Sequence, residues 1–453
     1  MKNITVSRAA AICGGTLFGN TDDREIRRVI IDSRLVGEGD MFVAYRGEKV
    51  DGHDYIASAL AKGAACCLAE FVPEGVHGAV IVVPDVQTAL EKLASAYRQE
   101  LSLPIIGVTG SVGKTTAKEM IYAVLSEKFN TLKTEGNLNN QIGVPMTLSR
   151  IEPEHEAAVV EMGITGFGQM SQLAAMVRPH IAVYTVIGHA HLEFLHDLEG
   201  VFRAKTEMLN FLDPDGAVIV NGDDAMLKDM KCSQRLIKVG LTDTCDVRAT
   251  KVCPGDNGRT DCVISYRGRS FKVHIPAYGQ HMVYAALAAA AVGFVMGLSD
   301  DEISRGIGNY TVVGRRGAVT DTGFVTLVDD CYNANPDSMK CAVDSLVKMP
   351  GRHVCVLADM LEMGSDTVNM HRDIGRYARA HGVSLVITTG ELGRYIAEGA
   401  GDCAVHFEDR SELINRLPRL LKKGDTVLVK ASNGMKLGSV SDAIKEMGDR
   451  DGK

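Results

Sequence analysis

The stretch "IIGVTGSVGKTT", residues 105–116, decides the fold expected for this 453-residue chain. Three of its first four residues are β-branched and apolar, which predicts a buried strand, and a run of good helix formers begins at Lys114. Between them, Gly110 and Gly113 allow the positive φ angles that a tight loop needs. The spacing misses the common Gly-x4-Gly-Lys-Ser/Thr rule by one residue, because Val108 stands six places before Lys114. Strand, glycine loop and helix in this order still predict a site for phosphate groups.

The chemistry expected of this loop is the binding of a nucleoside triphosphate. A helix that starts at Lys114 turns its free N–H groups and the positive end of its dipole toward an anion. Lys114 can reach the β- and γ-phosphates, and the hydroxyl of Thr115 can ligate Mg²⁺. A chance Gly-Lys-Thr in an ordinary strand-to-helix turn is the alternative. The residues expected around the triphosphate are Thr109, Gly110, Ser111, Val112, Gly113, Lys114, Thr115 and Thr116.

The chain around the loop divides into three α/β parts. In the middle part, continuous apolar strands alternate with amphipathic helices, which predicts a parallel sheet covered on both faces. Within it, residues 245–275 alternate as antiparallel strands do, and an Ala-rich helix follows. The strand–helix rhythm restarts at Gly314. The predicted fold class is therefore α/β with three domains: a small mixed domain over residues 1–98, a central P-loop parallel-sheet domain that binds the nucleoside triphosphate over 99–313, and a Rossmann-like domain over 314–453.

Composition narrows the class of protein. A net charge of −8 argues against general binding of nucleic acid, so any polyanionic ligand must be held by local positive features. No apolar run reaches 18 residues, so no membrane span is expected. Eleven scattered cysteines without a C-x2-C pair argue against a disulfide scaffold and against zinc, and fit a reducing compartment. With a start that reads as a short helix rather than an export signal, a cytoplasmic protein is expected.

The misfit in the loop is informative, because "TGSVGKTT" resembles the T-G-x-x-G-K-T-[TS] pattern of the Mur ligase family. The strings "TEGNLNNQIGVP", "VVEMG", "HLE", "AKTEML" and "NGDD" follow in that family's order, and with the flanking parts the resemblance covers nearly the whole chain. The resemblance implies an ATP-dependent enzyme that uses two Mg²⁺ ions to form an amide bond.

Three further side chains are candidates for the metal site. Glu161 ends an apolar strand of the parallel sheet, at the edge where ligands bind in such folds, and a carboxylate there suits Mg²⁺. His191 follows the next strand, and the resemblance assigns it to a second metal. The resemblance also implies that Lys205 is carbamylated by CO₂ and so becomes an anionic ligand; a plain salt-bridging lysine is the alternative. The resemblance thus implies Thr115, Glu161, His191 and carbamylated Lys205 as Mg²⁺ ligands, and Lys114, Glu161, His191, Lys205 and Arg315 as catalytic residues.

The third domain carries the most specific string, "DDCYNANPDSM", residues 329–339. It resembles the signature of the branch of the family that joins D-alanyl-D-alanine to UDP-N-acetylmuramoyl-tripeptide, so this domain is expected to bind the incoming dipeptide. Asn333 and Asn335 offer amide groups suited to a small zwitterion, although a helix-capping turn is the alternative. The residues expected to bind the dipeptide are Asp330, Tyr332, Asn333 and Asn335; Lys430 and Ser432 match the family less specifically.

The remaining assignments concern the nucleotides. Residues 31–56 resemble the family's uridine-nucleotide segment, in which Arg34 can pair with diphosphate oxygens unless it is a surface ion pair. Arg315 matches a Gly-Arg at the domain junction and is expected to neutralise phosphate on closure, a mere linker charge being the alternative. The family's two adenine-side asparagines are replaced by Met282 and Ala285, which leaves Asn221 as the nearby candidate. The residues assigned to the UDP substrate are Ser33, Arg34, Gly47 and His53.

The function expected from these residues is that of an ATP-dependent ligase in peptidoglycan precursor synthesis, acting through an acyl phosphate and releasing ADP and phosphate. Three alternatives remain open on sequence: a related ligase that adds a single amino acid to the same nucleotide or to a folate, a nucleotide-switch NTPase, and a P-loop kinase that stops at the phosphorylated product. A monomer is expected, with UDP-N-acetylmuramoyl-tripeptide and D-alanyl-D-alanine as partners.

Overall fold

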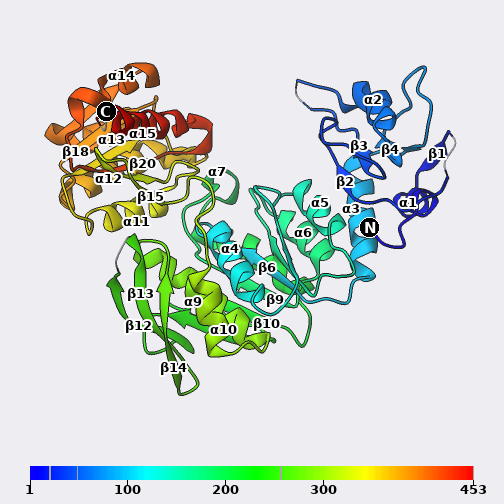
Figure 1. Cartoon of the computed structure of the whole chain (residues 1–453), viewed down its shortest axis with the longest axis horizontal. Coiled ribbons are helices and arrows are strands. Elements are labelled where there is room, and N and C mark those ends of the chain that lie inside the picture. Colours follow the sequence, from blue (N-terminus) through cyan, green and yellow to red (C-terminus); the bar gives the residue numbers. More distant parts are fainter. Residues whose placement is uncertain (20–21, 48, 256–257, 452–453) are drawn as a thin grey trace.

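Three separate β-sheets follow one another along the chain, of five, nine and six strands. They are seen in a computed structural model that describes residues 1–19, 22–47, 49–255 and 258–451. In Figure 1 the central domain carries the first domain (blue) on one side and the third domain (orange and red) on the other. The predicted α/β class with three domains is confirmed.

The first sheet is small and mixed, as predicted. Its strand order is β1-β5-β4-β3-β2, with β1 antiparallel to β5 and the other neighbours parallel. Cys66 and Cys67 are buried in β4, where they act as small apolar residues. The elements are α1 (Val6–Cys13), β1 (Thr16–Phe18), β2 (Val29–Ile30), β3 (Met41–Val43), α2 (Ile56–Ala61), β4 (Cys66–Ala69), β5 (Val80–Val82) and α3 (Val86–Gln99).

The central sheet places the phosphate loop at its middle. Its order is β14-β13-β12-β11-β10-β9-β6-β8-β7, parallel from β7 to β12 and antiparallel at β13 and β14, as the alternation of residues 245–275 predicts. Every residue of β6 and β8 is buried, because helices cover both faces. The strands are β6 (Ile105–Thr109), β7 (Thr131–Lys133), β8 (Ala157–Glu161), β9 (Ile181–Tyr184), β10 (Ala217–Asn221), β11 (Arg235–Gly240), β12 (Val247–Pro254), β13 (Thr260–Tyr266) and β14 (Arg269–Ile275).

The helices of the central domain pack closely. The Ala-rich α9 lies against α4, and α10 comes so near to α4 that a Cβ on Gly306 would lie 2.4 Å from the Cα of Val124. The helices are α4 (Lys114–Leu125), α5 (Gly143–Ser149), α6 (Gln169–Val177), α7 (Leu192–Leu195), α8 (Leu198–Thr206) with the 3-10 turn η2 (Glu207–Phe211), α9 (Gln280–Val295) and α10 (Asp300–Gly308).

The third sheet is parallel except for its first strand, in the order β15-β16-β20-β17-β18-β19. The short edge strands β15 and β19 are additions to the sequence expectation. Its elements are β15 (Ala318–Asp321), β16 (Thr326–Asp329), α11 (Pro336–Leu346), β17 (His353–Leu357), α12 (Thr367–Ala380), β18 (Leu385–Thr389), α13 (Gly393–Ala400), β19 (Ala404–Phe407), α14 (Arg410–Leu420), β20 (Thr426–Lys430) and α15 (Gly438–Asp451).

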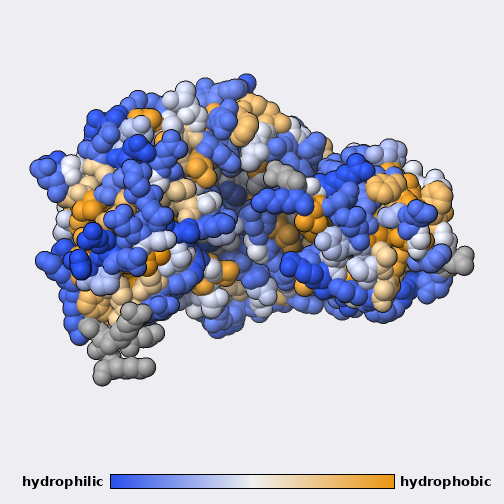
Figure 2. All heavy atoms as spheres, turned by 90° about the horizontal axis from the view of Figure 1, so that it is seen from above, coloured by the Kyte–Doolittle hydropathy of each residue, from blue (hydrophilic) through white to orange (hydrophobic). Residues whose placement is uncertain are grey.

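The surface polarity and the state of the cysteines are those expected from the amino-acid composition. From above, the molecule is mostly hydrophilic and is hollowed between the first domain, at the right of the view, and the rest (Figure 2). Among the described helices, none has both the length and the apolar character needed to cross a membrane. All eleven cysteines lie in the described part of the chain, and each is a free thiol.

Candidate active site

The phosphate loop, residues 109–116, joins β6 to α4 as the sequence predicts. Gly110 and Gly113 both have positive φ, 150° and 83°. A Cβ on Gly110 would lie 2.0 Å from the Oγ1 of Thr185, so only glycine fits there. The amine of Lys114 donates to the carbonyl of Gly110 at 2.8 Å, and burial lowers the pKa of Lys114. The first turn of α4 therefore presents its free N–H groups and one lysine at the carboxyl edge of the sheet.

Glu161, at the end of the neighbouring strand β8, lies directly beside the loop. Its Oε2 accepts from the hydroxyl of Thr115 at 2.9 Å, and its Oε1 accepts from the amide of Asn139 at 2.8 Å. The buried amine of Lys118 is 3.8 Å from the same carboxylate. Two predicted Mg²⁺ ligands, Thr115 and Glu161, are thus in contact with each other.

The burial of Lys205 near the phosphate loop is unexpected, because a lysine in an amphipathic helix usually reaches solvent. Its side chain on α8 is only 1% exposed. No hydrogen bond or ion pair joins it to any residue within the described ranges. Burial, and next the positive charge of Lys114, hold the pKa of Lys205 well below its usual value. The buried environment thus favours the neutral amine that carbamylation requires.

These residues fit Mg²⁺ bound together with phosphates. The described residues hold no group of three or more His, Cys, Asp or Glu side chains that could bind a metal unaided. Mg²⁺ in phosphoryl-transfer sites takes one or two carboxylates and completes its shell with phosphates and water. Thr115 with Glu161, and a carbamate on Lys205 with His191, would supply such partial sets of ligands.

The loop between β9 and α7, residues 185–191, ties the phosphate loop to the third domain. On one side, Ser111 donates its backbone N–H to Val186 O at 2.7 Å, and its hydroxyl bonds to Gly188. On the other side, the backbone N–H of His189 donates to Asp337, at the start of α11, at 2.6 Å. These contacts bring the predicted triphosphate site and the dipeptide segment to one interface.

The second contact of the β9–α7 loop with the third domain is made by His191. Its Nδ1 lies 2.5 Å from the carboxylate of Glu362, which follows β17. Burial lowers the pKa of His191, and Glu362 opposes that shift. Sequence analysis did not single out Glu362 or Asp337, because each meets its histidine across a domain boundary.

The dipeptide segment gathers at the carboxyl ends of β16, β17 and β20, the edge at which α/β sheets bind ligands. Lys430 pairs with Asp330 at 2.6 Å and also donates to the carbonyl of Asn333 at 3.0 Å. The Asn333 side chain is exposed. Asn335 is the N-cap of α11: its Oδ1 accepts from the N–H of Ser338 at 2.8 Å, in a reciprocal capping box. The helix-capping alternative thus describes Asn335 better than ligand binding does.

The dipeptide edge has two further predicted members. The ring of Tyr332 is covered by the guanidinium of Arg316, 3.7 Å from its centre. Ser432 accepts a hydrogen bond from the backbone N–H of Leu361 at 3.0 Å and so helps to hold the segment after β17. Both residues therefore stand at the same edge as Asp330.

On the side of the site where adenine is expected, two apolar residues replace the asparagines of the family pattern. Met282 and Ala285 are buried in the core of the central domain, so neither offers a polar group. Tyr284, between them, donates its hydroxyl to Asp223 at 3.1 Å. Asn221 ends β10 and accepts through its Oδ1 from the N–H of Asp223 at 3.1 Å. The polar groups present here are therefore Asn221, Asp223 and Tyr284.

In the uridine segment, two of the predicted ligands already have partners within the chain. The side chain of Arg34 is 86% exposed and pairs with Asp32 at 2.7 Å, which is the surface ion pair considered as an alternative. His53 is 2% exposed and stacks on Phe71; its Nδ1 lies 2.6 Å from Asp51 and its Nε2 accepts from a backbone N–H. Because both ring nitrogens are occupied, His53 holds the segment's shape rather than contacting a ligand.

The other two members of this segment take part in backbone bonds. The carbonyl of Ser33 accepts from Lys62 at 2.7 Å, and the N–H of Gly47 donates to Val50 O at 2.9 Å. These bonds leave the hydroxyl of Ser33 available to a ligand.

Comparison with known proteins identifies the family. The profile of the Mur ligase middle domain matches residues 108–293, the Mur ligase glutamate ligase domain matches 314–433, and the Mur ligase family catalytic domain matches 25–98. The UDP-N-acetylmuramoyl-tripeptide–D-alanyl-D-alanine ligase of Bacillus subtilis is 35% identical over 96% of this chain and 97% of its own length. The chain belongs to the Mur ligase family. Members are ATP-dependent ligases that form amide bonds, so that prediction is confirmed.

Solved structures support the same assignment. A MurF structure from Acinetobacter baumannii aligns with a TM-score of 0.89 at 30% identity, covering 98% of this Mur ligase and 99% of that chain. The MurF ligase of Thermotoga maritima in complex with ADP aligns with a TM-score of 0.84 at 27% identity, covering 94% and 98%.

Two adjacent arginines at the domain junction of this Mur ligase have different surroundings. Arg315 donates to Asp329 at 3.0 Å, to the carbonyl of Gly438 at 2.8 Å and to Asp442, all within the third domain. The charge of Arg316, in contrast, helps to lower the pKa of Lys114. After burial, Arg316 is thus a contributor to the environment of Lys114, whereas Arg315 is held by partners within its own domain, so we expect Arg316 to matter more for the phosphate loop.

Exchanging each arginine for methionine tests this difference. Arg316→Met is expected to lower kcat/KM for ATP by about 10-fold or more, because a positive charge near the phosphates is lost. Arg315→Met is expected to lower the free energy of unfolding by about 1–2 kcal/mol, because the buried Asp329 loses a donor. Steady-state kinetics and urea unfolding of both variants measure the two effects. An Arg315→Met enzyme with native stability and the larger kinetic loss would contradict this assignment.

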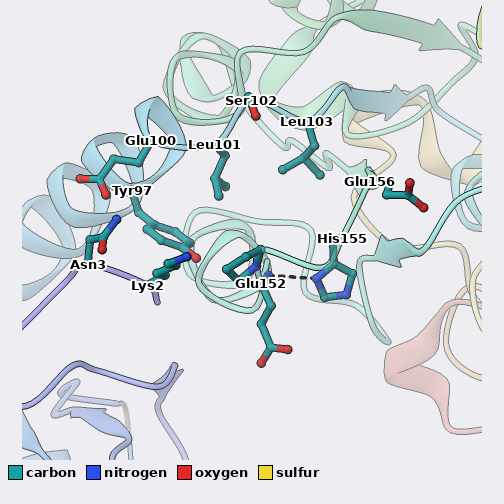
Figure 3. A pocket seen from close by; sticks show the side chains of 11 residues that line it. Lys2, Asn3, Tyr97, Glu100, Leu101, Ser102, Leu103, Glu152, His155 and Glu156 are labelled. Atoms are coloured by element: carbon teal, nitrogen blue, oxygen red, sulfur yellow. Dashed lines mark hydrogen bonds between the residues drawn. The ribbon is translucent and has the colours of Figure 1, made fainter.

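A cavity of about 460 Å³ lies where the first domain joins the central sheet of this Mur ligase. Figure 3 shows Tyr97 and Glu100 from the end of α3 on one side and Glu152 and His155 on the other. Its lining contains none of the residues predicted for the active site and belongs to the connection between domains. The lining residues are Lys2, Asn3, Tyr97, Glu100, Leu101, Ser102, Leu103, Glu152, Pro153, His155 and Glu156.

Proposed function

We propose that this Mur ligase joins D-alanyl-D-alanine to UDP-N-acetylmuramoyl-tripeptide at the expense of ATP. The observation that carries the proposal is the contact between the two halves of the site. The segment around Asp330 and Lys430 stands at the sheet edge that reaches, through Asp337 and Glu362, the loop bonded to the phosphate loop. The full-length similarity to the Bacillus subtilis ligase that bears these substrates in its name supports the same choice.

In the first step, the terminal carboxylate of the tripeptide attacks the γ-phosphorus of ATP. The bond from that phosphorus to the β,γ-bridging oxygen breaks, and ADP leaves. Both reactants are anionic, so catalysis consists mainly of neutralising charge and aligning the reactants. Lys114 and the N-terminal N–H groups of α4 hold the phosphates. Bound Mg²⁺ would supply further neutralisation, with Thr115, Glu161, His191 and carbamylated Lys205 as its ligands.

In the second step, the amine of the dipeptide attacks the carbonyl carbon of the acyl phosphate. The carbon–oxygen bond to phosphate breaks, and the proton that the nitrogen loses goes to the departing inorganic phosphate. Asp330 is a carboxylate suited to the ammonium group of the dipeptide, while Lys430 and the amide of Asn333 suit its carboxylate. Asn335 shapes the segment as the cap of α11.

The first domain would hold the UDP part of the substrate, with the peptide reaching to the phosphate loop. Figure 2 shows a hollow between the first domain and the rest of the molecule, and we infer that the substrate crosses it. Water must be kept from an acyl phosphate, so we infer that the domains close during turnover. Because ATP and nucleotide-linked precursors are cytoplasmic metabolites, we place the reaction in the cytoplasm.

Phosphate release with UDP-N-acetylmuramoyl-tripeptide tests the proposal. D-Alanyl-D-alanine is expected to stimulate release at least about 100-fold over single amino acids, because a site built to pair both ends of a dipeptide leaves charges unpaired with a shorter ligand. With ¹⁸O in the tripeptide's terminal carboxylate, one labelled atom is expected in the released phosphate. Equal stimulation by a free amino acid would reassign the substrate, and release that needs no amine would favour a nucleotide switch.

A further inference from the structure

The contact between His191 and Glu362 joins residues 171 positions apart and belonging to different domains. The carboxylate meets Nδ1 at 2.5 Å and so leaves Nε2 as the nitrogen available to another partner. A neutral imidazole that donates Nδ1–H to a carboxylate has its lone pair fixed on Nε2. Glu362 therefore decides both which nitrogen of His191 carries the proton and how the ring is oriented.

Both partners also have unusual backbone conformations. His191 has φ 55° and Glu362 has φ 62°, in the left-handed region that residues other than glycine rarely occupy. Such conformations persist only where the surroundings determine them, and they cluster at functional sites. Here two such residues share one hydrogen bond across a domain boundary. This arrangement indicates a functional contact rather than an ordinary surface loop.

The segment that carries Glu362 is held firmly on the third domain. The backbone N–H of Met360 donates to Nε2 of His371 at 2.8 Å, and that of Leu361 donates to Ser432 at 3.0 Å. After it, Gly364 packs against the backbone of α7, since a Cβ there would lie 3.5 Å from the N of Glu193. The carboxylate that contacts His191 is therefore carried by a segment whose backbone is fixed on the third domain.

We propose that Glu362 is a positioning residue for His191, supplied by the third domain to orient the imidazole toward the reacting phosphates and their metal ion. The idea rests on the proposed function, in which His191 is a metal ligand. A carboxylate that accepts from the far nitrogen of a metal-binding histidine fixes its tautomer and raises its basicity. Because Glu362 reaches His191 only when the third domain is docked, docking and completion of the second cation site are coupled.

The competing explanation is that the pair only holds two domains together. The chain offers a matched comparison, because His189 on the same loop forms the same kind of bond, 3.1 Å from Nδ1 to Asp337. Asp337 also accepts from the backbone N–H of His189, so it holds the loop itself. If docking were the whole role, losing either carboxylate would have similar consequences.

The test is binding of Mn²⁺ together with the β,γ-methylene analogue of ATP, followed by electron paramagnetic resonance of free Mn²⁺. The native chain is expected to bind two ions. Glu362→Ala is expected to weaken one of them by about 10- to 100-fold and to leave the other unchanged. Glu362→Gln, whose amide oxygen still accepts from Nδ1–H, is expected to bind the weakened ion with an affinity between those of the native chain and Glu362→Ala. Asp337→Asn is expected to retain the native affinity for both ions.

Native Mn²⁺ stoichiometry and affinity in Glu362→Ala would overturn the proposal, and so would an equal loss in Asp337→Asn. Because 45% of the Glu362 side chain is exposed, its replacement is expected to leave the fold intact, which thermal unfolding checks. The measurement uses neither peptide nor dipeptide. Failure here is therefore distinguishable from failure of the proposed reaction, which phosphate release reports separately.

Discussion

Lys205→Ala is expected to lower the ligase rate by about 100-fold or more, and added formate or acetate is expected to restore part of it. The neutral amine adds to the carbon of CO₂ and releases one proton, which gives a carbamate anion whose oxygens can act as ligands. Alanine leaves room at that place, and a small carboxylate can supply the missing oxygens. The structure supports this reaction because Lys205 is buried and its pKa is held well below its usual value by burial and by Lys114.

Rescue by acid distinguishes the carbamate from a simple structural lysine. Lys118 is the matched control, because it is equally buried but pairs with Glu119 at 2.9 Å and donates to Thr134 O at 2.7 Å. Lys118→Ala is expected to lose stability and to gain nothing from formate. Assays in buffers with and without CO₂, with formate titrated into both variants, make the comparison. Normal turnover by Lys205→Ala would end the carbamate hypothesis.

Most of the fold could be predicted because most of its strands can be recognised from their own residues alone. Every residue of β6, β8 and β20 is buried, and the interior of each strand is apolar, which predicts a buried strand whatever lies around it. The edge strands β15 and β19 escaped prediction because edge positions do not demand apolar residues: β15 ends in the exposed Thr320 and Asp321, and β19 begins with half-buried and exposed residues.

The phosphate site could be predicted for a similar reason. The chemistry of Lys114 and Thr115 is contained within one turn of α4, and Glu161 follows from the rule that parallel strands end at one edge. The burial of Lys205, by contrast, is invisible in the sequence of α8, because only the packed domain determines which side of a short helix faces inward. The family resemblance, not the helix pattern, pointed to this lysine.

The surroundings of several assigned residues depend on contacts that sequence does not encode locally. Arg315 and Arg316 are neighbours of the same chemistry, and only the packing of β16 and α15 decides that the first pairs with Asp329 and Asp442. His53 was assigned to the UDP substrate by the family resemblance of residues 31–56, but Phe71 and a backbone N–H 17 residues away enclose its ring. The role of Glu362 could not be predicted, because its partner His191 lies 171 residues away in the sequence.

Lys114→Met is expected to reduce kcat by about 10³-fold, because the lysine is the cation that the phosphate loop offers to the transferring γ-phosphoryl group. Its amine donates to Gly110 O at 2.8 Å and lies 3.5 Å from Ser111 O, so it folds back over the loop that it would leave to follow the γ-phosphoryl group. The backbone N–H groups of α4 remain in the variant and still hold the α- and β-phosphates. Affinity for ADP is therefore expected to fall much less than kcat.

Lys128→Met is the control for this change, because Lys128 is an exposed lysine just after the same helix. Its amine donates to Gly297 O at 2.8 Å and lies over the ring of Phe129, away from the phosphate loop. The Lys128→Met variant is expected to keep the native rate. Stopped assays of ADP formation give kcat for both variants, and calorimetric titration with ADP gives the affinity. A Lys114→Met enzyme that keeps a tenth of the native rate would mean that the N–H groups and metal ions alone neutralise the transferring phosphoryl group. An equal loss of ADP affinity and kcat would instead mean that Lys114 binds the ground state and the transition state alike, and so contributes to binding but not to catalysis.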